Sequence, residues 1–91
     1  MSRAVHVHIT GKVQGVGFRA WTERSARSRG LDGWVRNRRD GSVEAVIAGS
    51  EAVVEEMLAA LHRGPSSGRV DEVSHTPAEM PEKGFQVLPT A

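Results

Sequence analysis

The spacing of apolar residues alternates between two patterns along the chain, and the order of these patterns constrains the fold more than any other feature. Residues 4–10, AVHVHIT, alternate strictly along their length, which is typical of a half-buried strand. Residues 18–30, FRAWTERSARSRG, change to helical spacing, and Gly30 suits the left-handed position that closes a Schellman motif with Leu31. The inward stripe of this helix holds Phe18, Trp21, Thr22, Ser25 and Ala26.

A second region of alternation predicts a hairpin. Residues 33–49, GWVRNRRDGSVEAVIAG, contain two strand-like runs joined at Asp40-Gly41, which is a strong signal for a tight turn. The first run places Val35 and Asn37 on one face and Trp34, Arg36 and Arg38 on the other, and the second run places Val43, Ala45 and Ile47 on one face.

Residues 50–64, SEAVVEEMLAALHRG, carry the clearest helical pattern of the chain. Ser50 can cap the first turn, and Glu51 suits the positive end of the helix dipole. The inward stripe consists of Val54, Met57, Leu58 and Leu61. Two further short strands are predicted at residues 69–76 and 85–89.

The predicted order is strand, helix, strand, strand, helix, strand and a short last strand, which is the split β-α-β arrangement of the ferredoxin-like fold. Right-handed crossovers would place both helices on one face of a mostly antiparallel sheet, giving an α/β (α+β) sandwich. The other face would be open to water, which accounts for the polar side chains of His6, His8, Arg36 and Arg38. We expect residues 1–91 to form a single domain.

Composition limits the function classes that remain. The chain has no cysteine, which removes disulfides, thiolate metal sites and cysteine nucleophiles and fits a reducing cytoplasm. No long apolar run opens the sequence, so we expect neither a signal peptide nor a membrane span. A net charge of +1 argues against a dedicated nucleic-acid binder. Residues 1–45 carry a net charge of +5, which hints at a small anionic ligand, although ordinary scatter explains the charge alone more simply.

The segment between the first strand and the first helix, GKVQGVGFRA, is rich in glycine. Gly15 and Gly17 flank Val16 where the first helical N–H groups lack partners and the helix dipole is positive. Glycines there allow successive N–H groups to converge on an anion. Arg19 falls in the first turn, where a cation disfavours the helix but could clamp two phosphate oxygens. From composition, an anion site and a plain strand-to-helix connection are equally good interpretations.

Two familiar phosphate-binding motifs do not account for this segment. The Walker pattern fails because Gly11-Lys12 is followed by valine instead of serine or threonine. The dinucleotide pattern G-x-G-x-x-G/A matches Gly15 to Ala20 literally, but its context is missing. The second strand ends in arginines where that motif needs an acid, and the chain is too short for a doubly wound domain. We therefore treat the match as chance.

Two longer segments in order, GKVQGVGFRAW and GWVRNRRDGSVEAVIAG, strongly resemble the acylphosphatase family. GPSSGRVDEV and the terminal GFQVLPTA are also similar to that family, so the resemblance covers nearly the whole chain. It implies a ferredoxin-like sandwich, in agreement with the element order. It also implies cleavage of the carboxyl–phosphate bond of small acyl phosphates without metal or cofactor.

The resemblance further implies which residues form the site. The family's catalytic arginine falls on Arg19 and its catalytic asparagine on Asn37. Asparagine near a hairpin often bonds its own main chain, but given the resemblance we expect Asn37 to orient the attacking water. The face that Asn37 shares with Val35 would bring it near the helix start that carries Arg19. The phosphate-binding main chain falls on Gln14, Gly15, Val16, Gly17, Phe18 and Arg19.

Two other functions remain as alternatives. One is a non-catalytic phosphate- or anion-binding module, in which the same loop binds phosphate without an in-line water. The other is RNA binding, which ranks last because Trp34 is the only aromatic side chain expected on the open face of the sheet. His6 and His8 have a spacing that can bind metal, but no third ligand is evident, so we expect no metal site.

The remaining expectations concern the surroundings of the site. Trp21 and Trp34 are expected to cover the core, although either could line the substrate pocket. Arg36, Arg38 and Arg39 are expected to form a solvated edge. The expected partner is a small acyl phosphate, with no nucleic acid and no membrane, and the protein is expected to be a cytoplasmic monomer.

Overall fold

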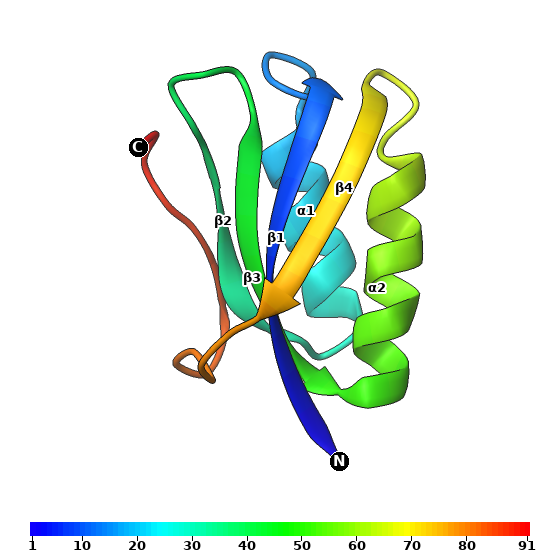
Figure 1. Ribbon diagram of the computed structural model, residues 1–91, viewed down its shortest axis with the longest axis vertical. Helices are drawn as coiled ribbons and strands as arrows, with labels where there is room; N and C mark the ends of the chain where they lie inside the picture. Colours follow the sequence, from blue (N-terminus) through cyan, green and yellow to red (C-terminus); the bar gives the residue numbers. More distant parts are fainter.

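Five strands form one sheet, and both helices cover the same face of it (Figure 1). The computed structural model describes residues 1–91. In chain order the elements are β1 (Ser2–Lys12), α1 (Phe18–Ser28), β2 (Asp32–Asn37), β3 (Val43–Ser50), α2 (Glu51–Arg63), β4 (Arg69–Pro77) and β5 (Phe85–Val87). This is the order predicted from the sequence. Neither helix is long and apolar enough to cross a membrane.

The strands lie side by side in the order β4-β1-β3-β2-β5. β1 is antiparallel to both β3 and β4, and β2 is antiparallel to β3 across the predicted hairpin. β5 is parallel to β2 and pairs Val87 with Val35 at the edge of the sheet. The mostly antiparallel, ferredoxin-like sheet is therefore confirmed, and the last strand of the chain lies beside the strand that carries Asn37.

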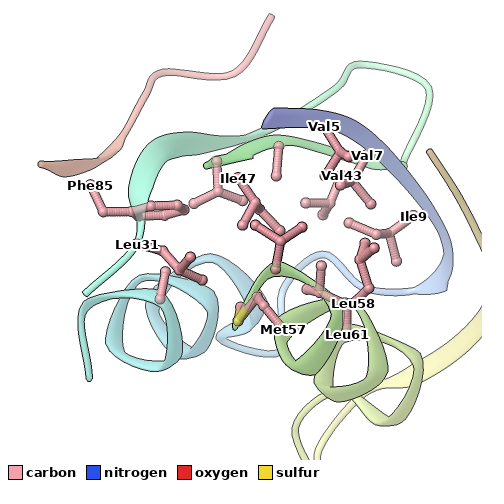
Figure 2. Close-up of a cluster of buried hydrophobic side chains, with 14 of the residues drawn as sticks. Val5, Val7, Ile9, Leu31, Val43, Ile47, Met57, Leu58, Leu61 and Phe85 are labelled. Carbon is pink, nitrogen blue, oxygen red and sulfur yellow. The ribbon is translucent and has the colours of Figure 1, made fainter. Parts of the chain in front are cut away.

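The hydrophobic core fills the space between the sheet and the two helices (Figure 2). The central strands contribute Val5, Val7, Ile9, Val43, Ala45 and Ile47, and the helices contribute Phe18, Ala26, Val54, Met57, Leu58 and Leu61. These are the apolar faces predicted by the two-residue and helical spacings. Burial of each large aliphatic side chain stabilises the fold by about 1.5–3 kcal/mol, so the sheet face and the helix positions are strongly specified.

The ends of the helices follow the expected chemistry. Gly30 is left-handed, with φ of 70°. Its N–H donates to the carbonyl of Arg27, and the N–H of Leu31 donates to the carbonyl of Ala26, both at 3.0 Å. These two bonds form the predicted Schellman motif. Ser50 caps α2 by accepting from the N–H of Val53 at 3.4 Å. The C-terminal end of α1 and the N-terminal end of α2 therefore lie where the sequence predicts them.

The open face of the sheet differs from the expectation of a solvated edge. The Glu44 carboxylate, only 9% exposed, accepts from Arg36 Nε at 2.6 Å and from Arg38 Nη1 at 3.2 Å. His6 Nε2 lies 2.5 Å from the same carboxylate. Trp34 also lies on this face, with the Arg36 guanidinium 4.8 Å from the centre of its ring. The prediction that Trp34 covers the core is wrong, whereas Trp21 does pack against the core.

These contacts keep Glu44 ionised in acid. Burial alone raises the pKa of Glu44, but the hydrogen bonds from Arg36, His6 and Arg38, with the charge of Arg36, outweigh it and lower the pKa to about 2. The carboxylate thereby neutralises part of the basic charge on the open face. The pair of Arg36 and Glu44 could have been predicted from the hairpin, because the two residues lie directly opposite each other in its register.

Candidate active site

The segment between β1 and α1 has the geometry of an anion-binding loop. Gly15 and Gly17 are left-handed, with φ of 73° and 77°, and Val16 between them is not, because no residue other than glycine has a positive φ. This alternation of hand turns successive main-chain N–H groups toward a common point. A Cβ at either glycine would meet no atom within 4 Å, so glycine serves the backbone conformation here and not a lack of space.

The start of α1 leaves its N–H groups available. Gly17 precedes the helix without any side-chain cap, and the first turn contains no acidic residue. The main-chain bond from the N–H of Trp21 to the carbonyl of Gly17, at 3.0 Å, closes the first turn of the helix. The other helix differs, because Ser50 caps α2 and Glu51 neutralises its dipole. The positive end of α1 thus points at the glycine loop without an internal counter-charge.

Arg19 and Asn37 meet at one cleft of about 320 Å³. Arg19 comes from the first turn of α1 and Asn37 from the last position of β2. Val35, two residues earlier on the same face of β2, is fully buried under the helices. The sequence prediction that Asn37 lies near the start of α1 therefore holds. The cleft is lined by Val13, Gly15, Gly17, Phe18, Arg19, Ala20, Glu23, Asn37 and Val87.

The side-chain carbonyl of Asn37 is left without a partner. Its Oδ1 is buried and has no hydrogen-bond partner within the chain. The sequence left open that Asn37 bonds its own main chain, but its side-chain carbonyl accepts no such bond. An unpaired buried acceptor costs about 1–3 kcal/mol. The main-chain carbonyl of Asn37 does have a partner, because it accepts from the N–H of Ala91 at 2.9 Å.

Gln14 and Val16, both expected in the phosphate-binding segment, are not among the residues that line the cleft. The Nε2 atom of Gln14 donates to the carbonyls of Arg38 and Ser42, at 2.6 and 2.8 Å. The carbonyl of Val16 accepts from Ser67 Oγ at 2.8 Å. The loop is therefore fixed on two sides, and Gln14 ties it to the hairpin that carries Asn37. The sequence did not indicate this role because the partners are distant main-chain atoms.

Glu23 is a cleft residue that the sequence interpretation missed. It follows Arg19 by four residues on α1, so both lie on the same side of the helix. Its carboxylate lies 3.1 Å from Arg27 Nη2, and that same nitrogen donates to the carbonyl of Phe85 on β5 at 2.8 Å. The regular spacing of Arg19, Glu23 and Arg27 was the signal that could have found it. Val87, across the cleft, was missed because the position of β5 depends on the sheet order.

The Acylphosphatase family model matches residues 5–87 of this sequence. The chain belongs to the acylphosphatase family. An acylphosphatase of Bradyrhizobium diazoefficiens is 52% identical and is covered over 99% of both chains. An acylphosphatase of Rhodospirillum rubrum is 53% identical, with 92% of this chain and 93% of the relative covered. The resemblance inferred from the two long segments is thus confirmed.

Solved acylphosphatases share the fold. The acylphosphatase from Coxiella burnetii superimposes with a TM-score of 0.91 at 32% identity, covering 96% of this chain and 93% of that one. The acylphosphatase from Bacillus subtilis gives a TM-score of 0.89 at 33% identity, covering 97% and 99%. The same arrangement matches 12% of the longer chain of full-length HypF, with a TM-score of 0.89. The acylphosphatase fold thus occurs both in chains of this length and within a longer one.

Proposed function

We propose that this acylphosphatase hydrolyses small acyl phosphates to a carboxylate and inorganic phosphate. The observation that carries the proposal is the meeting of three features at one cleft: left-handed glycines at an uncapped helix start, Arg19, and Asn37. The first two features suit a phosphoryl group, and the third suits a water molecule.

The phosphoryl group is held by the main-chain N–H groups between Gln14 and Arg19 together with the Arg19 side chain. Charge in a loose phosphoryl-transfer transition state resides on the three equatorial oxygens. Loop N–H groups that already converge stabilise this charge without reorganisation, and the planar guanidinium can bind two oxygens at once. Removing one such donor typically lowers kcat by about 10²–10³.

Asn37 orients the attacking water. Its side-chain amide hydrogen-bonds the water, which aims an oxygen lone pair at phosphorus opposite the acyl oxygen. As the new P–O bond forms, the bond between phosphorus and the acyl oxygen breaks, and the carboxylate leaves with the bonding electrons. The water proton passes to a phosphoryl oxygen. A carboxylate is a good leaving group, so the reaction needs neither a strong general acid nor a metal or cofactor in this scheme.

The proposal extends to the setting of the reaction. The substrate is a small molecule, and neither nucleic acid nor membrane takes part. The absence of cysteine fits a reducing compartment, and we assign the protein to the cytoplasm as a monomer. A monomer is sufficient because one chain supplies the loop, Arg19 and Asn37.

The test is hydrolysis of benzoyl phosphate in the presence of a chelator. The wild-type protein should turn over the substrate well above background. Arg19→Ala should lower turnover at least 100-fold and weaken competitive inhibition by inorganic phosphate, because both depend on the guanidinium. Asn37→Ala should lose most turnover while inhibition by phosphate is retained. Arg24→Ala, an exposed arginine on the same helix, is the matched control and should leave both quantities unchanged.

The outcomes separate the alternatives. A folded wild-type protein that binds phosphate without turnover would instead support the non-catalytic anion-binding module. Full activity of Asn37→Ala would remove Asn37 from the mechanism. Loss of activity on addition of the chelator would contradict the scheme without a metal.

A further inference from the structure

The cleft has a second part beyond the phosphate loop, and its side chains differ in character from those of the loop. Ala20 and Val87 are apolar and Glu23 is acidic, whereas the loop end of the cleft presents N–H groups and Arg19. A phosphoryl group at the loop leaves this second part for the acyl group. We infer that Glu23 makes the enzyme select uncharged acyl groups over acyl groups that carry a carboxylate, an inference that rests on the proposed function.

Helix geometry directs Glu23 toward the acyl group. Ala20 precedes Glu23 by three residues and Arg19 precedes it by four, so all three share one side of α1. The Glu23 carboxylate lies 3.1 Å from Arg27 Nη2, one turn further along α1, and Glu23 lines the same cleft as Arg19 and Ala20. An acyl group that leaves the phosphate site along α1 therefore passes the Glu23 carboxylate.

The counter-charge of Glu23 lies outside the cleft. Arg27 is the ion-pair partner at 3.1 Å, but it is not among the residues that line the cleft. Nη2 of the Arg27 guanidinium also donates a hydrogen bond to the main-chain carbonyl of Phe85 at 2.8 Å. A substrate in the cleft therefore meets the carboxylate more closely than the guanidinium. The Glu23 side chain is about one-third exposed (31%), so water weakens but does not remove the repulsion between two carboxylates.

The apolar walls act in the same direction. Val87 exposes 39% of its surface at the edge of the sheet, which is unusual for a large hydrophobic side chain in this chain. An alkyl or aryl group that covers Val87 and Ala20 is stabilised by the apolar surface that it removes from water. A carboxylate placed there would lose its hydration and face a like charge. Both effects favour the uncharged acyl group.

The experiment compares two substrates of equal chain length, butyryl phosphate and succinyl phosphate, which differ by a terminal carboxylate. For each variant the measured quantity is the ratio of kcat/KM for succinyl phosphate to kcat/KM for butyryl phosphate. Glu23→Gln should raise this ratio about fivefold, because it removes the repelling charge while keeping the size of the side chain. Arg27→Met should lower the ratio, because it leaves the Glu23 charge without its partner.

Glu56→Gln provides the matched control. Glu56 is also paired with an arginine, because its carboxylate lies 2.9 Å from Nε of Arg29, the residue that follows α1. It lies on α2, however, and does not line the cleft. Its substitution should leave the ratio unchanged.

Three results would overturn the inference. An unchanged ratio in Glu23→Gln would remove the charge selection, and an equal loss with both substrates would assign Glu23 to proton transfer or positioning instead. A ratio that rises in both Glu23→Gln and Arg27→Met would point to a loosened cleft. All three results require a wild-type enzyme that is active. If the proposed function fails, the wild-type protein hydrolyses neither substrate, and the inference fails with it.

Discussion

The side-chain amide of Gln14 donates to the main-chain carbonyl of Arg38 at 2.6 Å, which joins the phosphate loop to the strand end that carries Asn37. Gln14→Leu removes this bond and the one to Ser42 while keeping a similar volume. We expect kcat with benzoyl phosphate to fall about tenfold, because small displacements between the reacting groups are costly. The measurement is steady-state kinetics on protein whose folding has been checked by circular dichroism.

The control for Gln14 is Gln86→Leu. Gln86 is exposed on β5 and does not line the cleft, so its substitution should leave kcat unchanged. Equal kcat values for wild type and Gln14→Leu would show that the loop keeps its position without this brace.

Gly17 and Gly30 offer a matched pair for the phosphate loop. Both are left-handed, with φ of 77° and 70°, and a Cβ at either would meet no atom within 4 Å. Alanine at each position should therefore cost a similar free energy of unfolding, about 1–2 kcal/mol, from backbone strain alone. Only Gly17→Ala should also weaken inhibition by inorganic phosphate, because only Gly17 lies in the proposed cradle. Equal phosphate inhibition in the two variants would argue against a role for this backbone turn in binding.

Thr22 is fully buried on α1, and its hydroxyl has no hydrogen-bond partner. Thr22→Val replaces this hydroxyl with a methyl group of similar size. Because the buried hydroxyl is unsatisfied, we expect the free energy of unfolding to rise by about 1 kcal/mol, seen as a higher midpoint in thermal unfolding. Thr76→Val, at an exposed position on β4, should change stability by less than about 0.5 kcal/mol. A lower midpoint for Thr22→Val would mean that the hydroxyl has a partner in solution.

Glu44 gives a stability contribution that depends on pH. Burial raises its pKa, but the bonds from Arg36, His6 and Arg38 outweigh this effect and hold the pKa at about 2, against an ordinary value of 4.5. Because the folded-state pKa is depressed, the contribution is complete above about pH 4.5 and is lost as the pH falls toward 2. The wild type should therefore lose about 2 kcal/mol of its advantage over Glu44→Gln between pH 6 and pH 2.5.

Denaturant unfolding of both proteins at several pH values would measure this difference. Curves of unfolding free energy against pH that stay parallel down to pH 2.5 would contradict the depressed pKa of Glu44.

Much of the fold and part of the site could be predicted from the sequence because they depend on local spacing. The alternation in β1 and the hairpin fixed which side chains are buried, and the shared face of Val35 and Asn37 predicted that Asn37 lies near Arg19. The Schellman motif at Gly30 followed from one glycine and one leucine. The two long segments were sufficient to predict the family.

The rest depended on pairing between distant segments. The bonds of Gln14 go to main-chain carbonyls, which carry no residue-specific signal. Val87 reaches the cleft only because β5 pairs in parallel with β2. β5 has three residues, which are too few to predict the strand beside which it lies. Two expectations from the sequence conflict for Trp34, because the alternation places it on the open face with Arg36 whereas a large aromatic side chain is expected to cover the core. The structure agrees with the alternation.

The position of β5 also has a consequence for the order of folding events. β5 pairs with β2 although more than fifty residues separate Gly33 from Phe85, and Ala91 bonds the main chain of Asn37. Contacts between such distant segments form late, because closing the long loop between them is entropically costly. During refolding, helical circular dichroism should therefore recover before hydrolytic activity does, and the return of activity would mark the moment at which the last strand joins the sheet.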